Sequence, residues 1–201
     1  MITFMYNFIS NSQSGTPFDK TIVITNRSLV SGDYLEQIKY ALSLHPYSLI
    51  LREKDLSEEE YFALAETILA LCNKEGVQFF IHSHVNRAKE LGYPNIHIGI
   101  GDLPLIGPAF SQISVSCHSL ADVELAERAG ATQIVLGTIF ETDCKPGLAG
   151  KGVGFVKEVC RRTTLPVFAI GGITLKNLPL VQEAGAYGGC MMSYFMTYFI
   201  R

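Results

Sequence analysis

Short runs of β-branched and apolar residues recur along the chain, and Gly, Pro, Asn or Ser bounds each run. Runs of this kind are typical of buried strands. The pattern predicts eight strands, at residues 21–25, 48–53, 77–81, 95–98, 113–117, 133–137, 166–170 and 189–193.

Amphipathic stretches separate several of these runs and predict helices at residues 57–73, 119–129 and 174–184. The first opens with Ser57 and Glu60, which form a capping box. Ser119 and Thr174 are suitable N-caps for the other two, and a glycine follows each helix. The connection after the fourth strand is short, so the helix around 103–108 is expected to be vestigial.

Alternating strands and helices indicate parallel pairing through right-handed crossovers. Two architectures have this order of elements, a closed (β/α)8 barrel of the TIM type and an open doubly wound sheet. An open sheet usually carries GxGxxG after its first strand. Here Asn26, Arg27 and Ser28 follow that strand instead. We therefore expect one compact barrel domain over residues 1–201.

Composition narrows the function classes. The 201 residues are 48% hydrophobic and 17% charged, which excludes intrinsic disorder. A net charge of −3 argues against a nucleic-acid partner. No apolar stretch reaches the roughly 18 residues of a membrane span, and the N-terminus lacks a secretory signal. Five scattered cysteines fit neither a disulfide framework nor a zinc site, so a cytoplasmic protein with reduced thiols is expected.

Functional side chains of a barrel gather just after the carboxyl ends of its strands. The polar residues at these places, in chain order, are Arg52, Lys54, His82, His84, Asp102, Ser116, His118, the loop 141–145, Gly171, Gly172 and Ser193.

His118 is the candidate for acid–base chemistry, because its ring titrates near neutral pH and lies at a strand end. The alternative is a structural histidine. Cys117 faces the other side of the strand and makes no dyad with it. The spacing of His82 and His84 fits a metal pair without a third ligand nearby. His97, within a strand, is interpreted as structural.

Gly171 and Gly172 precede Thr174, so a phosphate group would meet free backbone N–H groups there. Loops after the seventh and eighth strands often bind phosphate in barrels. With Met192 and Ser193 the glycines form a candidate cradle. The alternative is a tight turn that requires glycine.

Four motifs carry a resemblance to a known family, in order along the chain: 51–54 (LREK), 116–119 (SCHS), 140–148 (FETDCKPGL, with Gly150 and Gly152 beyond) and 169–173 (AIGGI). From Thr21 to Ser193 the chain resembles the thiamine phosphate synthase superfamily and, more closely, its TenI-type thiazole tautomerase branch. The superfamily fold is a compact (β/α)8 barrel.

The synthases of this superfamily carry an Asn-Asp pair after the third strand that helps to hold Mg²⁺ and pyrophosphate. His82 and Ser83 stand in that place here, and Asp102 matches one of the two magnesium carboxylates. Ile50 and Cys144 also replace a Gln and a Thr of the synthases. The resemblance therefore favours the tautomerase, an isomerase that uses no metal and no cofactor.

The resemblance implies aromatisation of the 5-ylidene tautomer of a thiazole carboxylate phosphate, with His118 as the catalytic residue. It places the phosphate at Gly171, Gly172, Met192 and Ser193, and the carboxylate near Arg52 and Lys54. Thr142 and Lys145 are further substrate-binding candidates. The alternatives are an Mg²⁺-dependent thiamine phosphate synthase and a non-catalytic ligand-binding regulatory protein.

The last residues, Tyr194 to Arg201, are strongly apolar. This tail either packs on the barrel as a short last helix or joins the apolar residues Met1–Phe8 in a subunit interface. The second reading predicts an oligomer, and a homodimer is expected.

Overall fold

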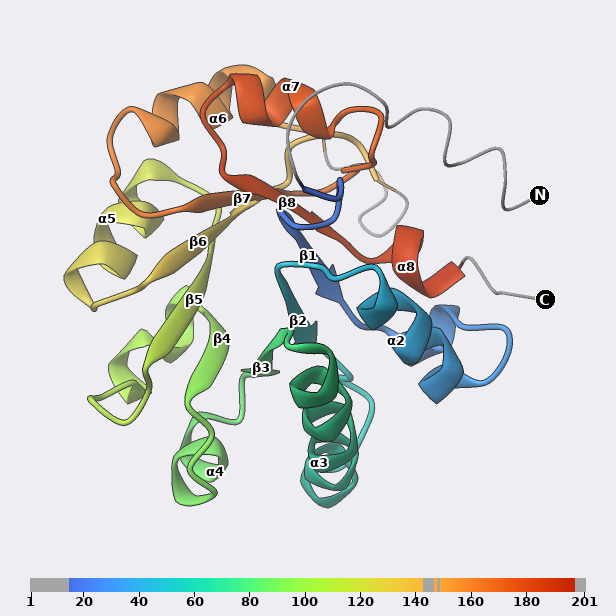
Figure 1. The fold of residues 1–201 in the computed structure, drawn as a ribbon. Coiled ribbons are helices and arrows are strands. Elements are labelled where there is room, and N and C mark those ends of the chain that lie inside the picture. The colour runs from blue at the N-terminus through green and yellow to red at the C-terminus, as the bar shows by residue number, and fades with distance from the viewer. Residues whose placement is uncertain (1–14, 143–146, 148, 198–201) are drawn as a thin grey trace.

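The computed structural model describes residues 15–142, 147 and 149–197. Eight parallel strands close into a barrel in chain order, and β8 pairs with β1 (Figure 1). The strands are β1 (Thr21–Ile24), β2 (Ser48–Leu51), β3 (Gln78–His82), β4 (Asn95–Gly99), β5 (Gln112–Cys117), β6 (Gln133–Gly137), β7 (Val167–Ile170) and β8 (Gly188–Met191). Each of the eight predicted strands is confirmed, with ends that differ by no more than two residues.

Helices lie on the outside of the barrel (Figure 1). They are η1 (Arg27–Leu29), α2 (Tyr34–Ser43), α3 (Glu58–Glu75), α4 (Val85–Glu90), η2 (Ile100–Leu105), α5 (Leu120–Arg128), α6 (Gly152–Cys160), α7 (Leu178–Glu183) and α8 (Ser193–Thr197). None of the helices in the described part of the chain is long and apolar enough to cross a membrane.

Alternation along the strands divides the apolar residues into two layers, as the period of a strand requires. One set points into the barrel and packs there as a separate cluster: Ile22, Ile24, Ile50, Phe80, Val135, Phe168 and Cys190. The other set lies under the helices and forms the larger core. The barrel interior is thus filled by side chains, and only its rim is open to chemistry.

All three predicted helices are present, but one of them begins later than predicted. Ser57 and Glu60 form the expected capping box at α3, and Ser119 caps α5 by accepting a hydrogen bond from the Asp122 N–H. The prediction that a helix begins at Thr174 is wrong, because α7 begins at Leu178. The short connection after β4 carries the 3₁₀ helix η2. The pattern did not predict α2, α4 or α6.

The described part of the C-terminal tail packs on its own barrel. Phe195 and Met196 of α8 are buried, and the Phe195 ring lies 5.7 Å from that of Phe18. The Gln37 side chain of α2 donates a hydrogen bond to the Phe195 carbonyl. The short-helix reading therefore applies up to Thr197, and the homodimer stays a prediction.

Candidate functional site at the carboxyl end of the barrel

Three hydrogen bonds hold His118 in place, at its backbone N–H, its backbone carbonyl and its ring Nδ1. Its backbone N–H donates to Asp122 Oδ2 at 2.7 Å, and its backbone carbonyl accepts from Lys151 Nζ. Its ring Nδ1 lies 2.7 Å from the Gly137 carbonyl oxygen, on the neighbouring strand β6. The residue itself stays accessible to solvent.

The contact with Gly137 assigns the tautomer of the His118 ring. A carbonyl oxygen only accepts hydrogen bonds, so Nδ1 must carry the proton. The neutral ring then has its lone pair on Nε2, which makes no hydrogen bond to any residue that the structure describes. A neutral imidazole with a free basic nitrogen is the form that accepts a proton from a substrate.

Lys151 is a further residue at this site that the sequence pattern did not predict. It precedes α6, and its ammonium lies over the Phe155 ring, 4.7 Å from the ring centroid. In sequence it stands between two glycines, a pattern that indicates an exposed loop. Only the fold brings it to His118, 33 positions earlier in the chain.

Gly171 and Gly172 lie where the loops after β6 and β7 meet. The Phe140 N–H donates to the Gly171 carbonyl at 3.0 Å, and both glycines have positive φ, 98° and 62°. A Cβ on Gly171 would lie 2.4 Å from Thr138 Cγ2, and one on Gly172 would lie 2.5 Å from the Glu141 carbonyl oxygen. The turn and the close approach thus both require glycine.

The free helix N-terminus that was predicted after these glycines is absent. Thr174 and Asn177 satisfy each other's backbone N–H groups with their side-chain oxygens. The Asn177 amide also donates to the Gly172 carbonyl at 2.8 Å. An anion at this place would therefore meet the glycine backbone rather than the first turn of α7.

Met192 and Ser193 follow β8, next to β7 in the barrel. Met192 is half-buried against the barrel interior, and Ser193 is the first residue of α8. Thr142 is half-buried after β6. Lys145 lies outside the described residues, so its predicted contact with substrate stays a prediction.

Arg52 and Lys54 form a basic group at the mouth of the barrel, which is the end where the strands finish. They lie on the side opposite Gly171 and Gly172. Burial, followed by the positive charges of Arg52 and Lys54, lowers the pKa of His82 to about 4. These charges act on His82 because they lie close to it. Arg52 is half-buried, and its backbone N–H donates to Thr25 Oγ1 at 2.9 Å. At neutral pH this part of the mouth carries positive charge beside an uncharged imidazole.

The ring of His97 lies under this group, 5.7 Å from the His82 ring between centroids. Its nitrogens bond the hydroxyls of Ser114 at 2.8 Å and Ser116 at 2.9 Å. Burial, with smaller effects from His82 and Arg52, lowers its pKa to about 3. His97 is buried within β4.

His82 and His84 do not form a metal pair. His82 faces His97, whereas His84 lies 3.2 Å from Glu58 and against the Tyr61 ring. Cys117 is buried on the helix-facing side of β5, as expected, and burial raises its pKa to about 12.

The donor set for the magnesium ion of the synthases is incomplete. His82 and Ser83 stand in place of the Asn-Asp pair, so Ser83 is found where one carboxylate is expected, and Asp102 on η2 matches the other one. Over the described residues, no group of three or more His, Cys, Asp or Glu side chains is arranged to hold a metal. Mg²⁺ prefers oxygen ligands, above all carboxylates, so a single carboxylate beside a neutral imidazole fits it poorly.

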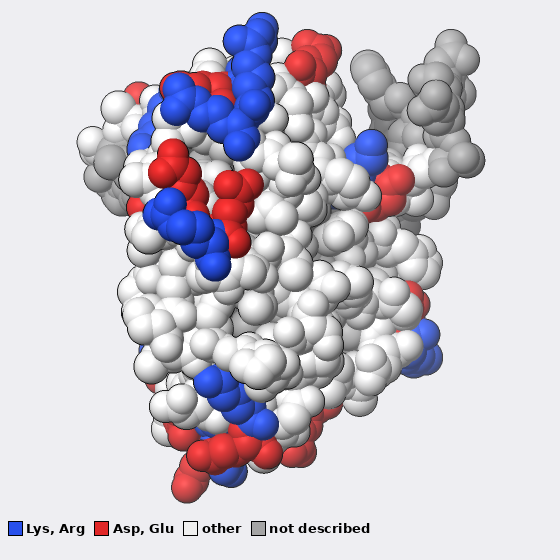
Figure 2. Space-filling model, turned by 90° about the vertical axis from the view of Figure 1, so that its left-hand side faces the viewer, with Lys and Arg blue, Asp and Glu red and all other residues white. Residues whose placement is uncertain are grey.

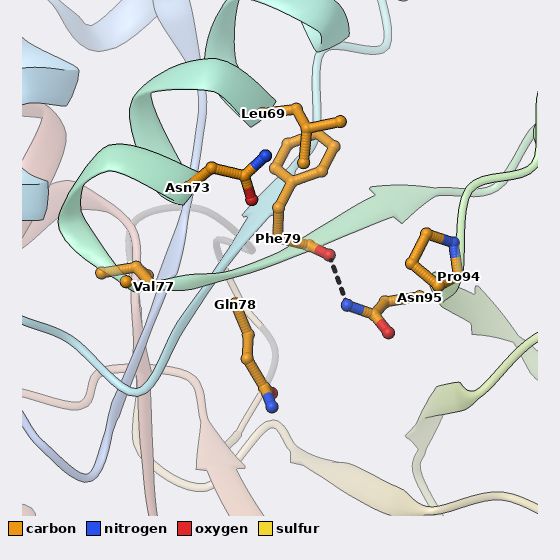
Figure 3. A pocket seen from close by; sticks show the side chains of 8 residues that line it. Leu69, Asn73, Val77, Gln78, Phe79, Pro94 and Asn95 are labelled. Carbon is orange, nitrogen blue, oxygen red and sulfur yellow. Dashed lines mark hydrogen bonds between the residues drawn. The ribbon is translucent and has the colours of Figure 1, made fainter.

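A surface depression of about 340 Å³ lies at the other end of the barrel, between α3 and the starts of β3 and β4 (Figure 3). Leu69, Phe79 and Pro94 line it, and Asn95 Nδ2 donates to the Phe79 carbonyl at 3.0 Å. It contains none of the candidate catalytic residues.

On the face over α5, acidic and basic side chains intermingle around a broad uncharged area, without a basic stripe (Figure 2).

Sequence and structure comparisons find known proteins that are similar to this chain. The chain is 32% identical over 180 residues to the thiamine-phosphate synthase of Coprothermobacter proteolyticus, an alignment that covers 87% of this chain and 85% of the relative. It is 31% identical over 178 residues to the "Putative thiamine-phosphate synthase 2" of Aquifex aeolicus, covering 86% and 95%. The solved structure of thiamine phosphate pyrophosphorylase from Pyrococcus furiosus has a TM-score of 0.78 and 26% identity, covering 91% of this chain and 89% of that one.

The family assignment rests on sequence and fold together. The closed eight-stranded barrel is the fold of the Pyrococcus protein. Residues 21–195, which include every strand and the described candidates at the mouth, match the family described as "Thiamine monophosphate synthase", TMP-TENI. This chain therefore belongs to the thiamine monophosphate synthase (TMP-TENI) family.

Proposed function

We propose that this chain is a thiazole tautomerase, which converts the 5-ylidene tautomer of a thiazole carboxylate phosphate into the aromatic thiazole. The observation that carries the proposal is the bond from His118 Nδ1 to the Gly137 carbonyl, because it leaves Nε2 as the basic nitrogen. A second argument is the pair His82 and Ser83, which carries no carboxylate where the synthases have an Asn-Asp pair.

The reaction moves one proton and changes no other atom. His118 Nε2 takes a proton from ring C2, and the electron pair moves into the conjugated ring. The resulting imidazolium returns a proton to the exocyclic carbon, which closes the aromatic system. One residue thus acts first as base and then as acid. The bond to Gly137 orients the ring, and the bonds to Asp122 and Lys151 hold the backbone of His118.

The two anionic ends of the substrate are assigned to two sides of the mouth. The phosphate lies against the backbone of Gly171 and Gly172, with Met192, Ser193, Thr142 and Lys145 around it. The carboxylate lies near Arg52 and Lys54, whose charges act on His82. A substrate with an anion at each end is thereby placed across the mouth, with its ring toward His118.

Thiamine phosphate synthase is the second candidate. The names of the relatives favour it, as does Asp102, which matches one of the two magnesium carboxylates. It requires a divalent cation, and the described donor set does not fit one. Magnesium dependence therefore separates the two activities.

The first experiment is a proton NMR assay of the purified full chain with the ylidene thiazole carboxylate phosphate, with and without EDTA. We compare wild type with His118→Asn. The Asn amide keeps a donor for the Gly137 carbonyl but cannot carry the proton. We expect EDTA to have no effect and the variant to lose about 10²–10⁴-fold in rate.

The matched control is His45→Asn, at an exposed histidine far from the mouth whose φ of 51° suits Asn. This variant should convert substrate as wild type does. A wild-type rate equal to the spontaneous rate would overturn the tautomerase. The same sample would then be tested for Mg²⁺-dependent synthase activity, and inactivity there would leave the ligand-binding protein.

A further inference from the structure

A buried chain of hydrogen bonds runs across the barrel interior beneath the mouth. His97 of β4 bonds Ser114 through Nδ1 and Ser116 through Nε2. Ser114 is fully buried, whereas Ser116 is half-exposed at the rim. Ser116 lies on β5, and His118 follows that strand directly, two positions later and at the same mouth of the barrel.

The ring of His97 is neutral, because burial lowers its pKa to about 3. A neutral imidazole has one nitrogen that donates and one that accepts. The two serines therefore play opposite parts. One donates its O–H to the bare nitrogen, and the other accepts the ring N–H.

Ser114 decides which nitrogen carries the proton. Its hydroxyl lies in the interior, and His97 Nδ1 is its one hydrogen-bond partner among the described residues. If Nδ1 carried the proton, the Ser114 O–H would be a buried donor without an acceptor. That penalty disfavours the Nδ1–H tautomer by roughly 5- to 150-fold. Ser114 thus donates to Nδ1, and Nε2–H donates to Ser116 Oγ.

We propose that His97 is a positioning residue, which Ser114 holds as the Nε2–H tautomer so that Ser116 presents its own O–H to the substrate. The Ser116 oxygen accepts a hydrogen bond from the His97 ring, so the hydrogen of its own hydroxyl is not used in that bond. This hydrogen can point toward the mouth, where Ser116 is accessible. Removing a proton from carbon spreads negative charge over the conjugated ring atoms, and a fixed O–H donor stabilises such charge. The choice of ligand rests on the proposed function, whereas the tautomer does not.

The tautomer is measured directly by long-range proton–nitrogen NMR of the full chain labelled with ¹⁵N-histidine, assigned with His97→Gln. Wild type should show a bare Nδ1 and a protonated Nε2 between about pH 5 and pH 8. Ser114→Ala should abolish that preference. The matched control is Ser48→Ala, another fully buried serine of the interior, whose hydroxyl has no partner in the described structure. A protonated Nδ1 in wild type would overturn the proposal, even if Ser114→Ala did not fold.

The donor role is measured by calorimetric titration with the aromatic thiazole carboxylate phosphate, a probe that requires no turnover. Ser116→Ala should weaken its binding about 10- to 150-fold, as for a lost bond to a charged group. Ser114→Ala should weaken it less, and Ser48→Ala not at all. Equal affinity of wild type and Ser116→Ala would overturn the donor role. Binding without turnover would instead count against the tautomerase alone.

Discussion

Burial keeps two histidines of the barrel interior uncharged at neutral pH. The pKa of His82 is lowered to about 4 and that of His97 to about 3, and burial is the largest cause for both. The sequence placed His82 near the mouth because it ends a strand. It could not show the partners of His97, because Ser114 and Ser116 lie on the next strand and meet His97 only through the register that pairs His97 with Ser114.

These two residues predict how stability depends on pH. Each has an unfolded pKa near 6.5 and a lower folded one, so below that value the unfolded chain binds more protons and the folded state loses stability. The loss is up to about 1.4 kcal/mol per pH unit for each histidine. We expect the free energy of unfolding, from urea titrations, to fall between about pH 6.5 and pH 5.

Substitutions test whether these histidines cause the change of the unfolding free energy with pH. His82→Asn should reduce it, because one buried neutral group is lost, while His45→Asn at the surface should not change it. An unfolding free energy that stays constant over this interval would contradict the burial of neutral rings.

Among the elements, the loops after β6 and β7 form one unit at the mouth. The bond from the Phe140 N–H to the Gly171 carbonyl and the contact of Gly172 with Glu141 join them. In the sequence, the two glycines suggested both a tight turn and an anion site. The close contacts of Gly171 with Thr138 and of Gly172 with Glu141 explain the turn, and the anion site stays a prediction. The prediction that a helix begins at Thr174 is wrong because the side chains of Asn177 and Thr174 form a local turn, which competes with helix there.

Alanine at Gly172 should disturb this unit. Its Cβ would meet the Glu141 carbonyl oxygen at 2.5 Å, and its φ of 62° is unfavourable for Ala. We expect a loss of about 2–4 kcal/mol in thermal or urea unfolding. Gly130→Ala is the matched control, because Gly130 also has positive φ, 85°, but nothing within 4 Å of the added Cβ. Equal losses for the two variants would show that backbone strain alone is responsible.

In the whole barrel, two strand pairs have short ladders. Between β3 and β4 the paired residues are Ile81 with Ile96 and His82 with His97. Between β7 and β8 they are Phe168 with Gly188 and Ala169 with Gly189. The ladder of β4 and β5 is longer and extends over 95–99 and 112–116. Eight strands in closed order were predictable from periodicity, but ladder lengths depend on the tilt of neighbouring strands.

The short ladders predict where the barrel opens first. Amides that bond across them should exchange with deuterium faster than those between β4 and β5. Asn95→Asp removes the side-chain bond to the Phe79 carbonyl beside the first ladder (Figure 3). It should speed exchange there about fivefold and leave the second ladder unchanged. Asn73→Asp, in the same depression, is the control. Uniform exchange over all eight ladders would contradict this picture.

The two short ladders divide the barrel into halves of four strands, β8 with β1–β3 and β4–β7. The candidate phosphate cradle extends over one boundary, with Gly171 and Gly172 on one half and Met192 and Ser193 on the other. Arg52 and His82 face His97 and His118 over the second boundary. A molecule bound over the whole mouth would therefore contact both halves and hold them together. The free energy of its binding would also be free energy of holding the barrel closed.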